Sequence, residues 1–398
     1  MDLLKQHSTK IISRVSKIIE NEKQLLFFIF AFGLALRLLG LINITLAGDN
    51  LTHWKIVGEI VTKGIYPLLG PRASLTGNFN LGPFYYYLLA IPYWIGGGNF
   101  RMAIIFFALI NSLSIPLLYL VAKRWFTKLQ AFGIIMLYAC SFYFIQIQSF
   151  PWNPYVLPLF IILSLYFINK IHAKKYHYFI LLTVSYGICL QLHATSLFLL
   201  PVFIYLLPLK KIPLKYYLAG IAALLLVNFP WIWVNFTGNF GQIRAGLLIL
   251  TPGKATACSL TNWLTNHGHG EKCFWYFRNT LLAFRFITIS LFGVNNVLLA
   301  LLSIIITVFY FAKTKLTENR FLFFWVFIPV FLFLFYSNSI YLHYLLILTP
   351  VPFFLMVVVL EKIKSRGKRW NYIVILLYLF IILINLGQYI WSLQFVRG

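Results

Sequence analysis

The sequence has 398 residues, of which 61% are hydrophobic and only 10% are charged. Soluble proteins average about 45–50% apolar and about 25% charged residues, so this composition excludes an ordinary soluble enzyme, a disordered protein and a disulfide-rich secreted module. Apolar runs of about 17–22 residues recur from Gln24 to the C-terminus. The runs are continuous rather than alternating, and lipid offers no partners for backbone polar groups, so they predict transmembrane helices rather than a barrel.

The net charge of +25 would suit a nucleic-acid-binding protein, but the placement of the charges favours a membrane protein. Lysine and arginine gather in short blocks between the apolar runs, as they do in cytoplasmic loops. We assign these blocks to solvated loops that face anionic lipid, and expect no nucleic-acid partner. No signal-peptide cleavage site follows the first apolar run, which is therefore expected to be a retained helix.

Six dense basic blocks set the expected topology if all of them lie on the cytoplasmic side. Together they hold 22 of the 33 basic residues: Lys5 to Lys23, Lys123 to Lys128, Lys170 to Lys175, Lys210 to Lys215, Lys313 to Arg320 and Lys362 to Arg369. The arrangement predicts eleven transmembrane helices, with the N-terminus inside and the C-terminus outside. Their expected positions are about 24–47, 102–122, 131–147, 155–169, 178–193, 196–208, 217–236, 295–312, 321–336, 341–360 and 371–391.

Two further apolar runs are expected not to cross, because counting them as spans would move later basic blocks to the outer side. The run 82–97 contains Pro83, Pro92 and interfacial aromatic residues, and the run 275–292 carries Arg278 and Arg285. Both are expected along the outer surface. Two long outer loops result, at about 48–101 and 237–294, and residues 1–398 are expected to form one all-α polytopic transmembrane domain.

The four cysteines divide into two pairs. Cys140 and Cys189 lie within expected spans, where inert packing is the simplest role. Cys258 and Cys273 lie 15 residues apart in the second outer loop. They predict a disulfide, provided that this side of the membrane is oxidising.

Carboxylates are scarce, which narrows the search for chemistry. Of the eight, only Asp49, Glu59 and Glu271 are expected outside. Asp49 follows the first span, where a carboxylate is costly unless it faces water or a partner. An active-site role and a helix N-cap role both fit Asp49. Glu59 lies four residues from both Lys55 and Lys63, which favours a solvated helix pair.

Several motifs follow Asp49 in the first outer loop and recur between later spans. They are Gly64-Ile65-Tyr66-Pro67, Gly70-Pro71-Arg72, the stretch Gly82 to Ala90, the stretch Ser149 to Pro158, Gln191-Leu192-His193, and the stretch Tyr344 to Pro350. On these motifs the chain resembles the GT-C glycosyltransferases, specifically bacterial relatives of protein O-mannosyltransferases and of the lipid A aminoarabinose transferase. The resemblance covers the whole chain and is strongest over 45–101.

The resemblance implies a GT-C fold and a site on the outer, periplasmic face of the cytoplasmic membrane. It also implies transfer of a hexose or pentose from a polyprenyl-phosphate donor to a lipid, glycan or protein acceptor, with no cofactor. Asp49 is implied as the catalytic carboxylate. A single carboxylate fits an inverting displacement, since a retaining one requires two carboxylates close together. Many relatives have Asp-Glu where this chain has Asp49-Asn50, and His-Pro-Pro or Lys-Pro-Pro where it has Leu81-Gly82-Pro83, so the acceptor stays open.

Arginines on the outer side are candidates for binding the lipid phosphate, because a guanidinium can hold two phosphate oxygens at once. Arg101 follows the glycines 96–98 at the start of the second expected span, where relatives place an arginine. Snorkelling at the interface is its alternative role. Arg72 in the first loop and Arg244 after the seventh span are further candidates, as are Lys254, Arg278 and Arg285 in the second outer loop.

Other outer-edge residues are candidates for binding the sugar. Trp152 and Asn153 lie between spans, where an aromatic side chain can stack on a sugar and an amide can bond it. His193, His343 and Tyr344 lie at turn ends and could line a cavity. The alternatives are an interfacial tryptophan and histidines bonded to neighbouring helices. The residues His267, His269, Glu271 and Cys273 form only a weak metal-binding pattern in a glycine-rich loop, so no metal is expected.

Two other functions remain open. A transporter or flippase of lipid-linked sugars would show inverted repeats and broken helices near the midplane, whereas this sequence has no clear repeat and gathers its candidates at one surface. An O-antigen-ligase-like enzyme would place essential cations in a large late outer loop, whereas here the early loop with Asp49 carries the distinctive residues.

Overall fold

The structure is a computed structural model of the 398-residue chain. It describes residues 21–39, 46, 48–73, 79–250, 275–313, 320–334, 340–365 and 367–395. Within these ranges the chain is helical, and its one β-bridge pairs Arg72 with Asn80. The all-α polytopic fold expected from the sequence is confirmed.

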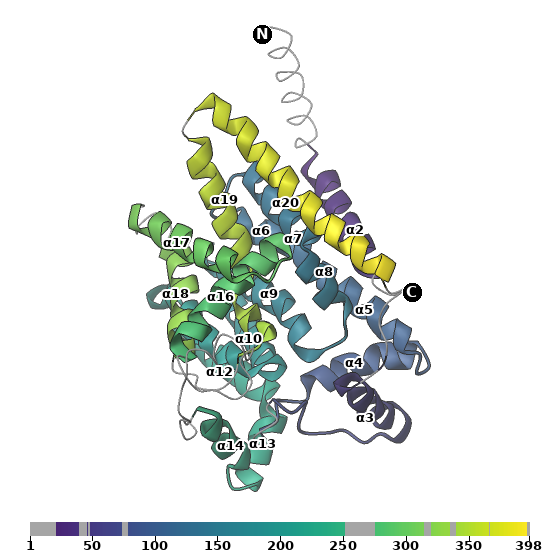
Figure 1. Cartoon of the computed structure of the whole chain (residues 1–398). Coiled ribbons are helices and arrows are strands. Elements are labelled where there is room, and N and C mark those ends of the chain that lie inside the picture. Colours follow the sequence, from purple (N-terminus) through teal and green to yellow (C-terminus); the bar gives the residue numbers. More distant parts are fainter. Residues whose placement is uncertain are drawn as a thin grey trace, which may run out of the picture.

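The described helices follow one another along the chain, and a long connection separates α3 from α4 (Figure 1). The first half of the chain contains α2 (Glu22–Leu39), α3 (Asp49–Lys63), α4 (Phe84–Ile95), α5 (Phe100–Ser112), α6 (Ser114–Ala122), α7 (Lys128–Cys140), α8 (Phe142–Ser149), η2 (Asn153–Val156), α9 (Leu157–His172), α10 (Tyr178–Leu192) and η3 (Ala194–Leu199). The second half contains α11 (Leu200–Leu206), η4 (Leu209–Lys211), α12 (Leu214–Val227), α13 (Phe229–Thr237), α14 (Gly241–Leu250), α16 (Trp275–Phe292), α17 (Val297–Lys313), α18 (Arg320–Leu334), η5 (Leu342–Leu348), α19 (Val351–Lys364) and α20 (Lys368–Phe395).

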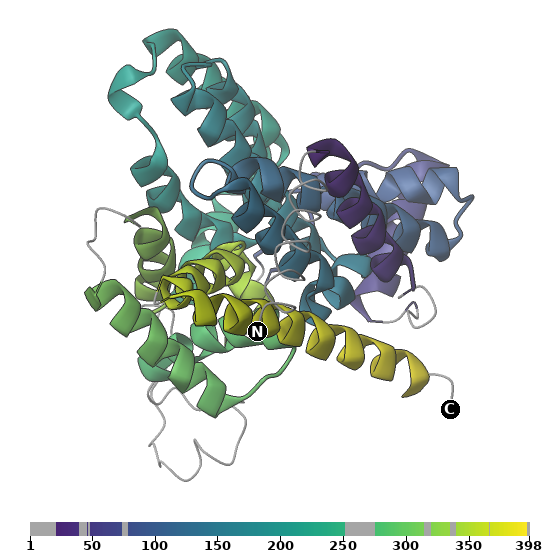
Figure 2. The ribbon, with the colours of Figure 1, turned by 90° about the horizontal axis from the view of Figure 1, so that it is seen from above.

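Each of the eleven expected spans overlaps one or two described helices; of the first span, 24–47, residues 40–45 and 47 lie outside the described residues. By length and composition alone, three described helices could cross a membrane, or seven if each bent pair is one span. The four bends are 59° between α7 and α8, 67° between α12 and α13, 100° between α16 and α17, and 58° between η5 and α19. Along α20, which runs along one flank of the molecule (Figure 2), only 22% of the apolar window is buried, as expected for a helix facing lipid.

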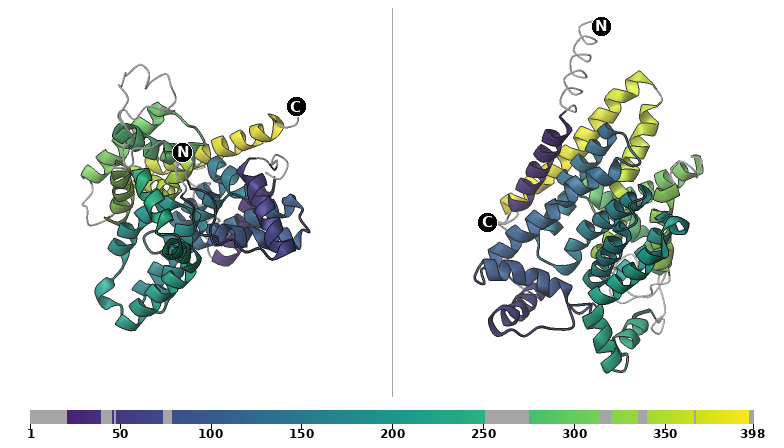
Figure 3. Two further views of the ribbon diagram at one scale, coloured as in Figure 1. Left: turned by 90° about the horizontal axis from the view of Figure 1, so that it is seen from below. Right: turned by 180° about the vertical axis from the view of Figure 1, so that it is seen from behind.

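Contacts between distant loops hold two groups of them together at opposite ends of the molecule. The Glu22 carboxylate at the start of α2 forms ion pairs with Lys123 (2.6 Å) and Lys128 (3.2 Å), which joins two basic blocks. At the opposite end, the Asn80 backbone N–H donates to Gln242 Oε1 (2.6 Å) and its carbonyl accepts from Trp231 Nε1 (2.9 Å), which joins the two expected outer loops. Helices α3, α4, α13 and α14 accordingly lie at one end of the molecule, away from the α19–α20 turn (Figures 1 and 3).

The run 82–97 forms α4, a helix of 12 residues. At 1.5 Å per residue it is about 18 Å long, too short for a hydrocarbon layer of about 30 Å. Helices α10 and α18, with 15 residues each, are also shorter than this layer, so the position of α4 outside the set of spans stays a prediction. The run 275–292 differs from expectation in its burial: the side chains of Ala283 and Phe286 on α16 are fully buried. Helix α16 therefore belongs to the packed core, whereas an interfacial helix would expose one face.

An aromatic cluster explains why α16 is buried. The ring of Phe144 on α8 lies 4.9 Å from Tyr138, 5.6 Å from Phe353 and 6.4 Å from Phe286, measured between centroids. These rings come from α7, α8, α19 and α16, so four helices meet at one point. Edge-to-face aromatic contacts contribute about 0.5–1.5 kcal/mol each beyond the apolar area that they bury.

A buried arginine lies in the same region and was not expected from the sequence. Arg37 on α2 is fully buried. Its Nε and Nη2 atoms donate to Gln148 Oε1 at 3.0 and 2.6 Å, and its Nη1 donates to the Gly33 carbonyl at 2.8 Å. Gln148 Nε2 in turn donates to the Tyr138 hydroxyl at 2.6 Å. The guanidinium is thus held by neutral acceptors, and the network ties α2 to α7 and α8.

Candidate functional site

Helix α3 positions Asp49 at the entrance to the first outer loop. Gly48 has a φ of 56°, a conformation that favours glycine, and the helix begins at the next residue. The helix ends at Gly64, which has a φ of 68° and donates its N–H to the Ile60 carbonyl. Asp49 is thus the first helical residue rather than the N-cap, so the N-cap interpretation is wrong. Its carboxylate is exposed, in the first turn, where the helix dipole favours negative charge.

The buried face of α3 packs on α4 through aromatic rings. The ring centroid of His53 lies 5.4 Å from that of Tyr85 and 5.5 Å from that of Tyr86, in edge-to-face geometry. Burial lowers the pKa of His53 to about 4, against a smaller opposing effect of the Asp49 carboxylate. Burial, with a smaller contribution from Asp49, raises the pKa of Tyr86 to about 12. His53 follows Asp49 by four residues, so the carboxylate lies about one helical turn from this aromatic set.

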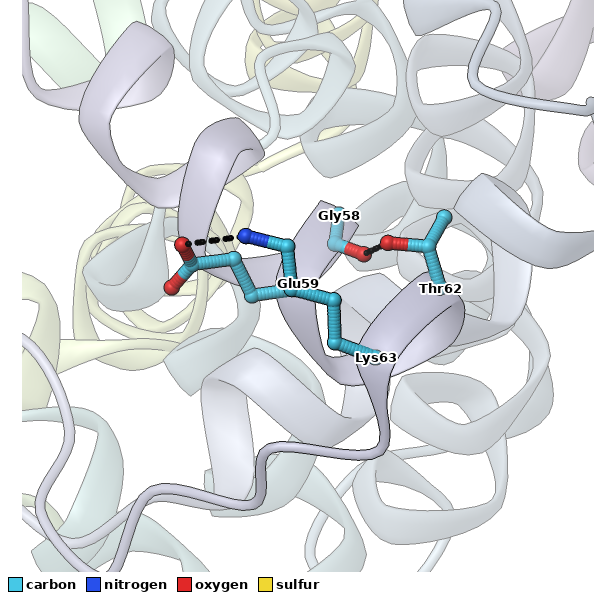
Figure 4. Close-up of polar contacts among 4 residues, drawn as sticks. All are labelled: Gly58, Glu59, Thr62 and Lys63. Carbon is cyan, nitrogen blue, oxygen red and sulfur yellow. Dashed lines mark hydrogen bonds and ion pairs between the residues drawn. The ribbon is translucent and has the colours of Figure 1, made fainter.

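The opposite face of α3 is a solvated surface. Lys63 Nζ donates to Glu59 Oε1 at 3.4 Å, with both side chains more than half exposed, and Thr62 Oγ1 donates to the Gly58 carbonyl at 2.7 Å (Figure 4). The expected pairing of Glu59 with Lys63 is confirmed. A surface pair of this kind contributes little to stability. Glu59 thus lies on the solvated face of α3 and pairs with a lysine, whereas Asp49 lies in the first turn of the same helix, one turn from His53.

Five of the expected sugar-binding residues meet in a second group. The centroid of the Trp152 ring lies 4.7 Å from that of His343, and the His193 ring lies 5.5 Å from His343 and 4.8 Å from Tyr344. We call Trp152, His193, His343 and Tyr344 the Trp152–His343 cluster. The adjacent Asn153 donates its amide N–H to the Leu192 carbonyl at 2.8 Å. This bond fixes η2 against the end of α10.

One hydrogen bond connects the two groups. Tyr85, which touches His53, donates its hydroxyl to the Pro151 carbonyl at 2.5 Å, one residue before Trp152. The Asp49 end of the first loop and the Trp152–His343 cluster are therefore held at the same end of the bundle. They come from α3, α4, the α8–η2 connection, the α10–η3 junction and η5.

Gln191 supports the start of α4, a role that the sequence did not predict. Its Oε1 accepts the Phe84 backbone N–H at 3.0 Å and its Nε2 donates to the Val227 carbonyl at 2.7 Å. A Cβ atom on Gly82 would lie 2.4 Å from Gln191 Cγ and Oε1, so only glycine fits there. Two features of the sequence hint at this contact. Gly82-Pro83 stands at the start of one apolar run, and the polar residue Gln191 lies inside another.

The expected arginines divide between two places. Arg101, exposed in the first turn of α5, lies beside α3, because Trp54 of α3 contacts Phe100 (5.1 Å between centroids) and donates its Nε1 to the Gly98 carbonyl at 3.3 Å. Arg72 faces Asn80 across the β-bridge, and Arg244 follows Gln242 on α14. The bond between Asn80 and Gln242 brings these last two segments together.

Several expectations lie outside the described residues. They are the Cys258–Cys273 disulfide, the position of Lys254 and the group of His267, His269, Glu271 and Cys273; the side chain of Arg278 is likewise not described. Within the described ranges, Cys140 and Cys189 are buried free thiols, as expected. Those ranges contain no group of three or more His, Cys, Asp or Glu residues that could hold a metal ion.

Comparisons with known proteins agree with the resemblance seen in the sequence. Residues 80–233 match the family model described as dolichyl-phosphate-mannose-protein mannosyltransferase. The structure is similar to the crystal structure of ArnT from Cupriavidus metallidurans bound to undecaprenyl phosphate, with a TM-score of 0.60 and 15% sequence identity. The match covers 85% of this chain and 60% of the ArnT chain. No curated protein matches the chain. The chain therefore has a fold similar to that of this ArnT structure.

Proposed function

We propose that the protein is a membrane glycosyltransferase that moves a sugar from a polyprenyl-phosphate donor to a hydroxyl group of a lipid, glycan or protein acceptor. The observation that carries the proposal is the exposed Asp49 carboxylate, held beside aromatic residues in a fold shared with a protein that binds undecaprenyl phosphate. The match of residues 80–233 to a mannosyltransferase family supports the reaction class.

In the proposed mechanism Asp49 is the general base. The acceptor hydroxyl attacks the anomeric carbon while its proton passes to the Asp49 carboxylate. The bond between the anomeric carbon and the phosphate oxygen breaks, and the polyprenyl phosphate leaves with the electron pair. A single displacement inverts the anomeric centre and needs one carboxylate. The Trp152–His343 cluster offers aromatic faces and the His343 imidazole to the sugar, whereas His193 Nδ1 is bonded to Thr195.

Arg101 is the proposed partner of the donor phosphate. It is exposed at the start of α5, and Trp54 ties that start to the helix that begins with Asp49. A guanidinium at this position would stabilise the negative charge that grows on the leaving phosphate. Arg72 and Arg244, which lie at the junction of the two outer loops, are proposed to contact the lipid or the acceptor.

The proposed location is the inner (plasma) membrane, with the N-terminus in the cytoplasm and the site on the outer, periplasmic face. The ion pairs of Glu22 with Lys123 and Lys128, which gather basic loops at the end opposite the site, support this orientation. On an oxidising outer side, Cys258 and Cys273 would form a disulfide. Peptide mapping without reduction tests that pairing.

A transporter or flippase of the same lipid is the alternative, and one experiment separates the two. Purified protein is reconstituted in liposomes that contain undecaprenyl phosphate bearing a radiolabelled sugar, with a cell-envelope extract as the acceptor. A glycosyltransferase releases undecaprenyl phosphate and labels the acceptor. Movement of the intact lipid-linked sugar across the bilayer without cleavage would contradict the proposal and favour the alternative.

A further inference from the structure

The buried face of α3 carries polar atoms that have no hydrogen-bond partner. Both side-chain polar atoms of Asn50, Oδ1 and Nδ2, are unpaired, and so is Nδ1 of His53. The two residues are 3% and 6% exposed. They follow Asp49 by one and four residues, so all three belong to the first turns of one helix.

Unpaired groups of this kind are costly. Folded proteins pair the great majority of their buried polar side-chain atoms. Leaving one unpaired costs about 1–3 kcal/mol, because the group loses its bonds to water and gains nothing in return. Three such atoms within two turns, next to an exposed carboxylate, are therefore difficult to explain by folding alone. They are explained if the side chains of α3 move enough to admit a ligand, which then completes their hydrogen bonds.

The chemistry of the surroundings narrows the class of ligand. The Asn50 amide both donates and accepts hydrogen bonds and carries no charge. Because burial lowers the pKa of His53 to about 4, its imidazole is neutral at pH 7. The edges of Tyr85 and Tyr86 surround that imidazole. Neutral groups that donate and accept, set among aromatic rings, suit the hydroxyl groups of a sugar and do not suit a phosphate, which requires cations or several N–H donors.

We propose that Asn50 and His53 form a neutral subsite that binds the hydroxyl groups of a sugar ring beside the Asp49 carboxylate. The ring belongs either to the donor sugar or to a glycan acceptor, which share this chemistry. The subsite rests on the proposed glycosyltransferase function and adds to it a second set of residues, besides the Trp152–His343 cluster, that recognise the uncharged part of the substrate. It also separates sugar recognition on α3 from phosphate binding at Arg101.

The test uses Asn50→Leu, which keeps the size of the side chain and removes its hydrogen-bonding atoms. Because Asn50 has no protein partner to lose, we expect the thermal midpoint to be unchanged or higher. We expect catalytic efficiency to fall about tenfold or more, the effect of one or two lost hydrogen bonds to substrate. His53→Phe, which keeps an aromatic ring, should behave in the same way. Glu59→Gln, on the solvated face of the same helix, should leave both quantities unchanged.

Binding measurements in lipid nanodiscs identify the source of the sugar. The probes are undecaprenyl phosphate alone and undecaprenyl phosphate bearing a hexose or a pentose. If the subsite holds the donor sugar, Asn50→Leu weakens binding of the sugar-bearing lipid and leaves binding of undecaprenyl phosphate intact. If it holds a glycan acceptor, both lipid affinities are unchanged, and the half-saturating concentration of the cell-envelope acceptor rises.

Two results would overturn the subsite. One is an Asn50→Leu variant that binds and transfers as the wild type does. The other is a lower thermal midpoint together with an equal loss of affinity for both lipids, which would show that Asn50 serves folding. In either case the wild type still transfers sugar, so the glycosyltransferase function stands. A wild type that releases no undecaprenyl phosphate would instead remove the function and the subsite together.

Discussion

Tyr85 Oη lies 2.5 Å from the carbonyl oxygen of Pro151, and this hydrogen bond joins the Asp49 end of the first loop to the Trp152–His343 cluster. Tyr85 is fully buried and also contacts His53. The bond therefore sets the distance between the proposed base and the proposed sugar-binding residues. Small errors in such a distance lower catalytic rates because the reacting atoms must be aligned.

Replacement of Tyr85 tests this coupling. Tyr85→Phe removes the hydroxyl and leaves the Pro151 carbonyl without this donor, so we expect a loss of about 0.5–1.5 kcal/mol of stability. We expect a several-fold fall in kcat, measured as release of polyprenyl phosphate. Tyr87→Phe is the matched control, because Tyr87 also donates to a proline carbonyl, that of Pro67, at 2.6 Å, but outside the cluster. Equal activity of the two variants would contradict the coupling.

Gly82 gives a second test of how α4 is positioned. A Cβ in Gly82→Ala would lie 2.4 Å from Gln191 and would displace the side chain that bonds Phe84 and Val227. Overpacking of this kind costs about 1–3 kcal/mol, which a thermal melt of the purified protein would detect. Gly387→Ala is the control, because nothing lies within 4 Å of that Cβ and alanine favours the helix α20. A Gly82→Ala variant as stable as Gly387→Ala would show that the bonds of Gln191 to Phe84 and Val227 do not contribute to stability.

The hydrogen bonds of Arg37 predict that replacing Gln148, a neutral residue 111 positions away in the sequence, lowers stability strongly. Gln148→Leu removes the oxygen that accepts two guanidinium hydrogen bonds and leaves a buried cation with only carbonyl acceptors. Hydrogen bonds to charged groups contribute about 1.5–3 kcal/mol, so we expect a loss of at least that size. Gln146→Leu, at a more exposed position on the same helix α8, should have little effect. A thermal midpoint unchanged by Gln148→Leu would contradict the role of this network.

The sequence predicted the parts of this structure that follow from local composition. Apolar runs were enough to locate most of the helices. The polar and aromatic residues between spans included Trp152, His193, His343 and Tyr344, which the fold brings together. These four residues lie where helices end at the same surface, and such ends tend to meet. Their positions relative to the expected spans therefore predicted that they could come together.

Pairings between distant residues could not be predicted in the same way. Arg37 and Gln148 are 111 residues apart, and each lies inside an apolar run with no local sign of its partner. The burial of α16 depends on rings from three other helices, whereas its two arginines suggested an interface. The position of Asp49 as the first helical residue depends on the φ of Gly48, which the residue types alone left open.

The donor phosphate site has its own test. Arg101→Ala should lower kcat/KM for the lipid donor by an amount on the order of 1.5–3 kcal/mol, and Arg101→Lys should lower it less, because lysine keeps the charge but loses the planar fork. Both variants should fold normally, since Arg101 is exposed. If Arg101→Ala leaves donor kinetics unchanged while Arg72→Ala abolishes them, the phosphate site belongs to the first loop instead.

The central claim is that Asp49 performs the chemistry, and the rate of undecaprenyl phosphate release tests it most directly. Wild type, Asp49→Asn and Glu59→Gln are compared in the same liposomes with the same labelled donor. Loss of a general base commonly costs about 10²–10⁴-fold in rate, so Asp49→Asn should lose nearly all release while its thermal midpoint stays close to that of the wild type. Glu59→Gln should remain active. An Asp49→Asn variant that keeps more than roughly half of the wild-type rate, against that expected loss, would contradict the account.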